Sequence, residues 1–286
     1  MRTSLTISYI LSSSITSAFM MQKPAINIRP TRDNERQMLG STPTADDLTS
    51  VKGVIFDIDG TIADSAKLGY DATVVVLENN GCPTITEEIY HEHTIYTTPE
   101  RLARHAGLVP GDADFEAIGQ KLGDEFDDFY VKLVDTKTAG FFPGIEDFLN
   151  NIPSEVKLGA LTNACVAYAH AVLTVNCPVA AGVGGGLPES GGIYDRFGSI
   201  HGADDSPKPK PYPDGLYVIC KELGLEPEEC VYIGDSPSDG KAADAAGMPS
   251  IGVLWGSHTE EKVRNAPFNY VCSTVEEMQA LLPRKK

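Results

Sequence analysis

The chain has 286 residues, of which 42% are hydrophobic and 22% charged, and this is the composition of an ordinary globular protein. A chain of this length can bury one core and still form a smaller second domain. The formal net charge is −17 and the pI is about 4.7. This acidic balance argues against non-specific binding to nucleic acid or to anionic membranes, and it means that any site for an anion needs a local positive field.

Residues 1–50 differ in composition from the rest of the chain. Residues 1–31 contain no acidic residue and many serines and threonines, and the weakly apolar stretch 5–21 is interrupted by Ser12, Ser13 and Ser14. This stretch lacks the apolar length that a membrane span needs. An acid-poor, hydroxyl-rich leader resembles an organellar transit peptide, and the step Ser17-Ala18-Phe19 favours a plastid. The alternative is a disordered tail on a cytoplasmic protein, with residues 32–50 as a linker.

Four short apolar runs predict strands that are buried on both faces, at residues 51–56, 156–161, 230–234 and 250–254. Helical patterns follow them at residues 165–173, 214–223, 240–246 and 274–282. Strand and helix in alternation predict an α/β fold, a Rossmann-like doubly wound parallel sheet. In such sheets ligands bind beyond the carboxyl ends of the strands, which is where Asp57, Thr162 and Asp235 fall.

Residues 65–141 interrupt this alternation. Helices are predicted at residues 65–80, 86–94, 99–105 and 112–135, with start and stop signals such as Thr86 before two glutamates and Gly107 after a helix. A helical insertion after the first strand predicts a cap domain over the carboxyl edge of the sheet. The core would then comprise residues 51–64 and 142–286, and the glycine-rich stretch 181–192 would be a loop. The six cysteines show no metal-type spacing and indicate no disulfide framework.

The sequence Asp57-Ile58-Asp59-Gly60 follows the first predicted strand directly. The strand ends here and Gly60 permits a sharp turn, so the two carboxylates can point differently. One carboxylate can therefore attack while its neighbour moves a proton. Taken alone, these residues fit an Asp-rich turn that caps a helix equally well.

Three further elements follow in order, each in the context of a predicted strand end or loop. They are Leu161-Thr162-Asn163, the segment KPKPYP at residues 208–213, and IGDSPSD at residues 233–239 followed by AADAAGM at residues 242–248. Together with FDIDGTIADS at residues 56–65, they resemble the haloacid dehalogenase (HAD) superfamily over residues 51–282. The resemblance is to its phosphatases with a helical cap after the first motif, a group that includes phosphoglycolate phosphatases.

The resemblance implies hydrolysis of a phosphate monoester through an aspartyl-phosphate intermediate. Asp57 is then the nucleophile, and Asp59 protonates the leaving group and later takes a proton from water. Lys208 would pair with Asp57 and the phosphoryl group, with Lys210 as a competitor two residues away. The hydroxyl of Thr162 and the backbone N–H of Asn163 would hold phosphate oxygens.

The resemblance also implies Mg²⁺ as cofactor, because a carboxylate cannot approach a phosphate dianion unless the charge is offset. Side chains of Asp57 and Asp235 and the backbone carbonyl of Asp59 would supply ligands. Asp239 would bind the metal directly or orient its waters. His91 and His93 are a possible metal pair, but cap surface is the plainer interpretation.

The expected partner is a small phosphorylated metabolite, with 2-phosphoglycolate as the leading candidate; no nucleic acid, membrane or oligomeric state is predicted. The segment Ile95-Tyr96-Thr97-Thr98 departs from the glycine-containing loop of many relatives. Arg101 and Arg104 could bind a substrate carboxylate or lie on a solvated helix face.

Other activities on the same motifs fit less well. Asp59 disfavours a dehalogenase, and no lysine lies between Lys67 and Lys121 to serve a phosphonate hydrolase. A sugar-phosphate mutase uses the same four motifs and stays an alternative. So does a catalytically silent phosphate-binding protein, since a fold alone does not imply function.

Overall fold

The structure, a computed structural model, describes residues 48–177 and 192–285. The predicted leader therefore lies outside the described residues, except for its last three, and so does nearly all of the predicted loop at 181–192. Leu48, within the predicted linker, is fully buried against the core. Any shortened chain intended for assays should therefore begin before Leu48.

Six parallel strands form the central sheet in the order β5-β4-β1-β6-β7-β8. The strands are β1 (Gly53–Phe56), β4 (Lys157–Leu161), β5 (Phe197–His201), β6 (Cys230–Gly234), β7 (Ser250–Val253) and β8 (Tyr270–Cys272). Every residue of β1, β6 and β7 is buried, as the apolar runs predict. The order, with β1 between β4 and β6, confirms the predicted doubly wound α/β fold.

The edge strands β5 and β8 were not predicted from the sequence. Strand β5 carries Gly198 and Ser199, and β8 has three residues, so neither forms a continuous apolar run. The pairing of β5 with β4 also shifts register between Leu158 and Gly159. Edge strands have a neighbour on one side only, and they consequently need less apolar sequence than central strands.

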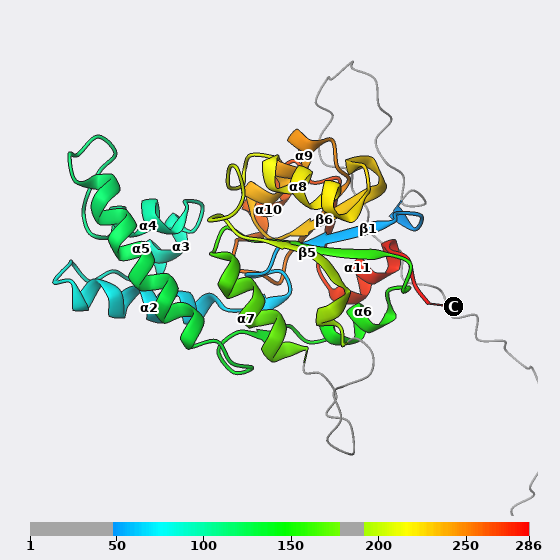
Figure 1. Cartoon of the computed structure of the whole chain (residues 1–286), viewed down its shortest axis with the longest axis horizontal. Helices are drawn as coiled ribbons and strands as arrows, with labels where there is room; N and C mark the ends of the chain where they lie inside the picture. Colours follow the sequence, from blue (N-terminus) through cyan, green and yellow to red (C-terminus); the bar gives the residue numbers. More distant parts are fainter. Residues whose placement is uncertain (1–47, 178–191, 286) are drawn as a thin grey trace, which may run out of the picture.

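Helices cover both faces of the sheet (Figure 1). Helices α8 (Asp214–Leu223), α9 (Pro237–Ala246) and α10 (Glu260–Asn265) lie on one face, and α6 (Ile145–Asn151), α7 (Val166–Asn176) and α11 (Val275–Leu281) lie on the other. Two 3₁₀ turns, η1 (Tyr194–Arg196) and η2 (Pro227–Glu229), precede β5 and β6. Neighbouring residues of β1 point to opposite faces of the sheet. Ile55 packs on the face covered by α8, and Phe56 packs on the face covered by α6 and α7.

The cap is inserted between β1 and β4 and stands beside the carboxyl ends of these strands (Figure 1). It contains α2 (Ala66–Asn79), α3 (Glu87–His93), α4 (Thr98–His105) and α5 (Phe115–Lys132). The chain enters it through β2 (Ala63–Asp64) and leaves it through β3 (Gly140–Phe141), and these two strands pair antiparallel. Gly119 of α5 lets that helix approach α4, because a Cβ there would lie 2.6 Å from the carbonyl oxygen of Pro99.

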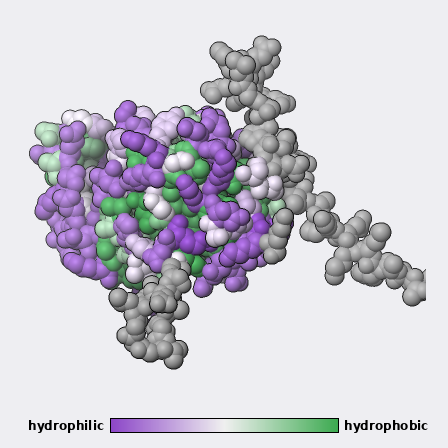
Figure 2. Space-filling model, turned by 45° about the vertical axis from the view of Figure 1, so that its right-hand side comes forward, coloured by the Kyte–Doolittle hydropathy of each residue, from purple (hydrophilic) through white to green (hydrophobic). Residues whose placement is uncertain are grey.

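Hydrophilic side chains dominate the face drawn in Figure 2, in keeping with the large net charge. Each of the six cysteines has a free thiol, and none forms a disulfide. Among residues 48–177 and 192–285, no helix combines the length and apolar character that crossing a bilayer requires.

Candidate active site

The register of the central strands brings three predicted residues to one edge of the sheet. Phe56 of β1 lies opposite Ala160 of β4 and Ile233 of β6, so the three strands end nearly level. The residues that follow, including Asp57, Thr162 and Asp235, consequently share one neighbourhood. The backbone N–H of Asp57 donates to the carbonyl of Ile233 at 2.8 Å, which carries the parallel pairing one residue past β1.

The carboxylate of Asp57 is buried, with 5% of the residue exposed. Its Oδ1 accepts a hydrogen bond from Lys210 Nζ at 2.7 Å, and its Oδ2 accepts one from Thr61 Oγ1 at 3.3 Å. Burial first and the charge of Asp239 second raise the pKa of Asp57 well above its ordinary value, while Lys210 opposes them. The side chain is therefore held rigidly in a site where added positive charge stabilises its ionised form.

The site lysine is Lys210, and the choice of Lys208 from the sequence was wrong. The side chain of Lys208 is exposed, with its Nζ 4.9 Å from the ring centre of Tyr212. Lys210 is buried, and its Nζ lies 2.7 Å from both Asp57 Oδ1 and Asp239 Oδ1. Burial alone lowers the pKa of Lys210, but the charges of Asp239 and Asp57 outweigh it and the net shift is upward.

Asn163 explains why the loop presents Lys210. The side-chain amide of Asn163 donates to the backbone carbonyl of Lys210 and accepts from its backbone N–H, both at 3.0 Å. This pair of bonds fixes the loop at the residue whose side chain enters the site. The segment KPKPYP contains the K-P-x-P pattern twice, starting at Lys208 and at Lys210. The second match, closer to the start of α8, was the signal that could have identified Lys210.

Asp235 and Asp239 follow β6 at the start of α9. Ser236 caps this helix: its Oγ accepts from the Asp239 backbone N–H, and Asp239 Oδ2 accepts from the Ser236 backbone N–H at 2.9 Å. Asp235 Oδ2 accepts from the backbone N–H of Ser257 at 2.7 Å. Burial and the charge of Asp239 raise the pKa of Asp235 to about 7. A capped helix start thus aims two carboxyl groups at the same space as Asp57.

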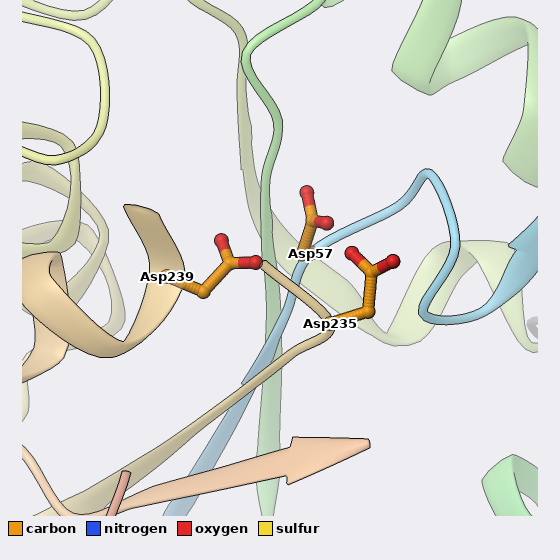
Figure 3. A group of neighbouring side chains, drawn as sticks. All are labelled: Asp57, Asp235 and Asp239. Atoms are coloured by element: carbon orange, nitrogen blue, oxygen red, sulfur yellow. The ribbon is translucent and has the colours of Figure 1, made fainter. Parts of the chain in front are cut away.

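Asp57, Asp235 and Asp239 turn toward one another at this edge (Figure 3). Each of the three buried side chains offers an oxygen, and the three oxygens lie within 4.8 Å of one another. One lysine is the nearest compensating cation, so the cluster holds more negative than positive charge when it is ionised. Such a set of hard oxygen donors fits a divalent cation of the Mg²⁺ type.

Asp59 receives four hydrogen bonds from hydroxyl groups. Its Oδ1 accepts from Ser65 at 2.5 Å, Tyr168 at 2.6 Å and Tyr130 at 3.0 Å, and its Oδ2 accepts from Thr162 at 3.2 Å. Tyr130 comes from cap helix α5 and Tyr168 from core helix α7, and their rings stack 4.1 Å apart at 15°. Sequence analysis missed both tyrosines, because neither stands in a motif; their only signal is a polar-tipped aromatic on a buried helix face.

A cavity of about 110 Å³ opens between the core and the cap. Its core wall includes Asp57, Asp59, Lys210 and Asp235, and its cap wall includes Tyr90, Arg101, Phe126 and Tyr130. His91 also lines the cavity, whereas His93 pairs through Nδ1 with Nδ1 of His105 at 3.3 Å. Neither histidine belongs to a group of three potential metal ligands within the part of the chain that the structure describes.

Comparisons with known proteins agree with this architecture. The family model for haloacid dehalogenase-like hydrolases matches residues 51–247. A phosphoglycolate phosphatase from Salmonella typhimurium is 30% identical over 239 residues, which cover 76% of this chain and 87% of that protein. One from Yersinia pestis is 30% identical over 215 residues, covering 75% and 85%.

Solved structures share the fold. A haloacid dehalogenase-like hydrolase from Streptococcus pneumoniae has a TM-score of 0.63 at 21% identity and covers 81% of this chain and 98% of its own. The structure of CbbY from Rhodobacter sphaeroides in complex with phosphate has a TM-score of 0.58 at 22% identity, with 78% and 93% covered. At these identities the similarity establishes the fold alone.

Proposed function

The chain belongs to the haloacid dehalogenase-like hydrolase family and is a phosphatase, and from this premise we propose that it hydrolyses a small phosphate monoester through a phosphorylated Asp57, with Mg²⁺ as cofactor. The observation that carries the proposal is the meeting of Asp57, Asp59 and Lys210 at one cavity. A nucleophile, a proton carrier and a cation are the groups that phosphoryl transfer to an aspartate needs.

Mg²⁺ would be held by carboxylate oxygens of Asp57 and Asp235 and by the backbone carbonyl of Asp59, and it would offset the charge of the phosphate dianion. Asp239 has both oxygens engaged, Oδ1 by Lys210 and Tyr232 and Oδ2 by Ser236. We therefore assign Asp239 the positioning of Lys210 in preference to direct ligation.

In the first step, a carboxylate oxygen of Asp57 attacks phosphorus and the bond from phosphorus to the ester oxygen breaks. Asp59 gives a proton to the departing alkoxide, and Lys210 stabilises charge that gathers on the phosphoryl oxygens. In the second step, water attacks phosphorus, Asp59 takes its proton, and the bond to Asp57 breaks to release inorganic phosphate. The hydroxyl groups around Asp59 hold its carboxylate in place for both proton transfers.

We propose 2-phosphoglycolate as the leading substrate. Two observations support it: the chain is 30% identical to phosphoglycolate phosphatases over about three quarters of its length, and the cavity is small. A cavity of about 110 Å³ lies well below the ~300 Å³ at which pockets for drug-sized ligands begin. A short ester fits such a cavity better than a nucleotide or a bulky sugar phosphate.

The test is hydrolysis of a panel of phosphate esters by the purified protein, with Mg²⁺ and with EDTA. We expect release of inorganic phosphate only with the metal, and 2-phosphoglycolate should give the highest kcat/KM. Asp57→Asn should abolish turnover, whereas Asp128→Asn, a change at an exposed acid of the cap, should not. Acid-quenched enzyme should carry its phosphate on the peptide that contains Asp57.

The alternatives give different outcomes in the same panel. A sugar-phosphate mutase would isomerise a sugar phosphate without releasing phosphate, because the phosphoryl group returns to the substrate. A silent binding protein would bind esters and turn over none. Substantial turnover by Asp57→Asn would exclude Asp57 as the nucleophile.

We further propose that residues 1–50 direct the protein to an organelle, with a plastid favoured over the cytoplasm. A fluorescent protein fused after residue 50 should accumulate in that organelle. Uniform cytoplasmic fluorescence would contradict the proposal.

A further inference from the structure

Arg101 places a buried positive charge in the cap wall of the active-site cavity. It belongs to α4, and 5% of the residue is exposed. The cavity that it lines also contains Asp57 and Lys210 on the opposite, core side. A guanidinium group cannot escape the cost of burial by losing its proton, so such a charge needs compensation from its surroundings.

The immediate neighbours of Arg101 orient the guanidinium without neutralising it. Its Nη1 donates to Thr73 Oγ1 at 3.0 Å. Its Cζ lies 4.8 Å from the ring centre of Phe126 and 5.1 Å from that of Tyr90. Cation–π contacts and hydrogen bonding to the neutral hydroxyls of Thr73 and Tyr90 fix the plane of the group but supply no negative charge.

No carboxylate lies within 4.0 Å of the Arg101 guanidinium among the described residues. Arg104, one helical turn away, shows the ordinary arrangement, because its Nη2 pairs with Glu100 at 2.7 Å. The charge of Arg101 lowers the pKa of Asp127, but burial and the charge of Asp204 outweigh this effect and raise that pKa to about 6. Arg101 is thus a buried cation that lacks a partner of opposite charge.

The free donors of Arg101 face the cavity. Thr73 and the hydroxyl of Tyr90 engage only part of its five N–H groups, and no Arg101 nitrogen is among the described buried atoms that lack a partner. The remaining donors are available to the active-site cavity, which Arg101 lines. Two adjacent N–H donors on a planar cation match the two oxygens of a carboxylate or phosphate.

We propose that Arg101 forms a second anion-binding site, which holds an oxyanion at the end of the substrate remote from the scissile phosphate. The proposal rests on the proposed phosphatase function and narrows its substrate class. The preferred ester carries two anionic ends, one beside Asp57 and Lys210 and the other at Arg101. The small volume of the cavity, about 110 Å³, favours a short ester whose carboxylate lies close to the phosphate.

The experiment compares three esters of similar size: 2-phosphoglycolate, 2-hydroxyethyl phosphate, whose far end is neutral, and ethylene glycol bisphosphate, whose far end is a phosphate. The readout is the ratio of kcat/KM for each ester with a charged far end to kcat/KM for 2-hydroxyethyl phosphate. In Arg101→Met this ratio should fall about 30-fold for 2-phosphoglycolate, equivalent to about 2 kcal/mol for a hydrogen-bonded charge pair. Arg101→Lys should restore part of the ratio, and Arg104→Met should leave it at the wild-type value.

The outcomes separate this proposal from the phosphatase assignment. If the wild type hydrolyses none of the esters, the proposed function fails. If it hydrolyses them but the ratio is the same in the wild type and Arg101→Met, the second site is refuted. If Arg101→Met loses its helical circular dichroism, the comparison of Arg101→Lys with Arg101→Gln replaces it. A higher kcat/KM ratio in Arg101→Lys than in Arg101→Gln supports the second site, and equal ratios in these two variants overturn it. Comparison of the carboxylate and bisphosphate esters identifies which oxyanion the site prefers.

Discussion

Replacing Lys210 by Met should damage both stability and activity, whereas the same replacement of Lys208 should affect neither. Lys210 Nζ lies 2.7 Å from Asp57 and from Asp239, inside a nearly inaccessible site. Without it, two buried carboxylates face each other with no cation between them. Lys208 is exposed and lies beside the ring of Tyr212.

The expected size of the effect follows from this geometry. Removing one partner of a buried ion pair costs about 3–5 kcal/mol. The two acids freed by Lys210→Met can each take up a proton, and burial already raises the pKa of Asp57. Protonation limits the cost, so we expect a loss near the lower end, about 3 kcal/mol at pH 7. Turnover should fall by about 10³, as for loss of a donor aimed at developing charge. Lys208→Met should stay within ~0.5 kcal/mol of the wild type.

Urea unfolding in EDTA at pH 5 and pH 7, with phosphate release measured alongside, checks both numbers. The loss of stability in Lys210→Met should be smaller at pH 5, because protonation of the freed acids relieves their repulsion. The placement of the loop would be refuted if Lys208→Met lost activity and stability while Lys210→Met kept both.

Three further perturbations address other parts of the site. Tyr168→Phe removes the 2.6 Å hydrogen bond to Asp59. It should lower kcat about tenfold for alkyl phosphate esters but less for 4-nitrophenyl phosphate, whose leaving group needs little proton donation. An equal loss of kcat for both kinds of ester would contradict a role of Tyr168 in orienting Asp59. Because burial raises the pKa of Asp235 to about 7, the folded state keeps that proton to higher pH than the unfolded chain, so metal-free stability should decline as pH rises from about 4 to about 7. Asp235→Asn should make this decline shallower, with buried Asp57 accounting for the rest, and should weaken the stabilisation by Mg²⁺ in thermal unfolding; an unchanged slope would argue against it. A Cβ on Gly256 would lie 2.2 Å from Asp235 Oδ2, so Gly256→Ala should raise the Mg²⁺ concentration for half-maximal activity about tenfold. A wild-type Mg²⁺ requirement in this variant would refute the steric effect.

The sequence was sufficient to predict that the acidic residues meet at one edge of the sheet. Parallel strands that alternate with helices end at a common edge. This arrangement places Asp57, Thr162 and Asp235 together independently of the conformation of the loops. The helical insertion was equally predictable, because its capping signals are local: the hydroxyl of Thr86 accepts from the Ile89 backbone N–H at the start of α3.

The identity of the lysine and the surroundings of Asp59 were not predictable in this way. Lys208 and Lys210 begin overlapping K-P-x-P patterns, and the amide of Asn163, 47 residues distant, selects between them. Tyr130 and Tyr168 reach Asp59 from 71 and 109 residues away. Such contacts depend on how the cap packs against the core, and neither periodicity nor local motifs encode that.

The hydroxyl of Tyr130 ties a residue of the cap to a carboxylate of the core. Moving α5 away from the core would separate the stacked rings of Tyr130 and Tyr168 and break that bond. Asp59 therefore has its full set of hydroxyl donors only while the cap lies against the core. The position of the cap and the surroundings of the proton carrier are thus coupled through one side chain.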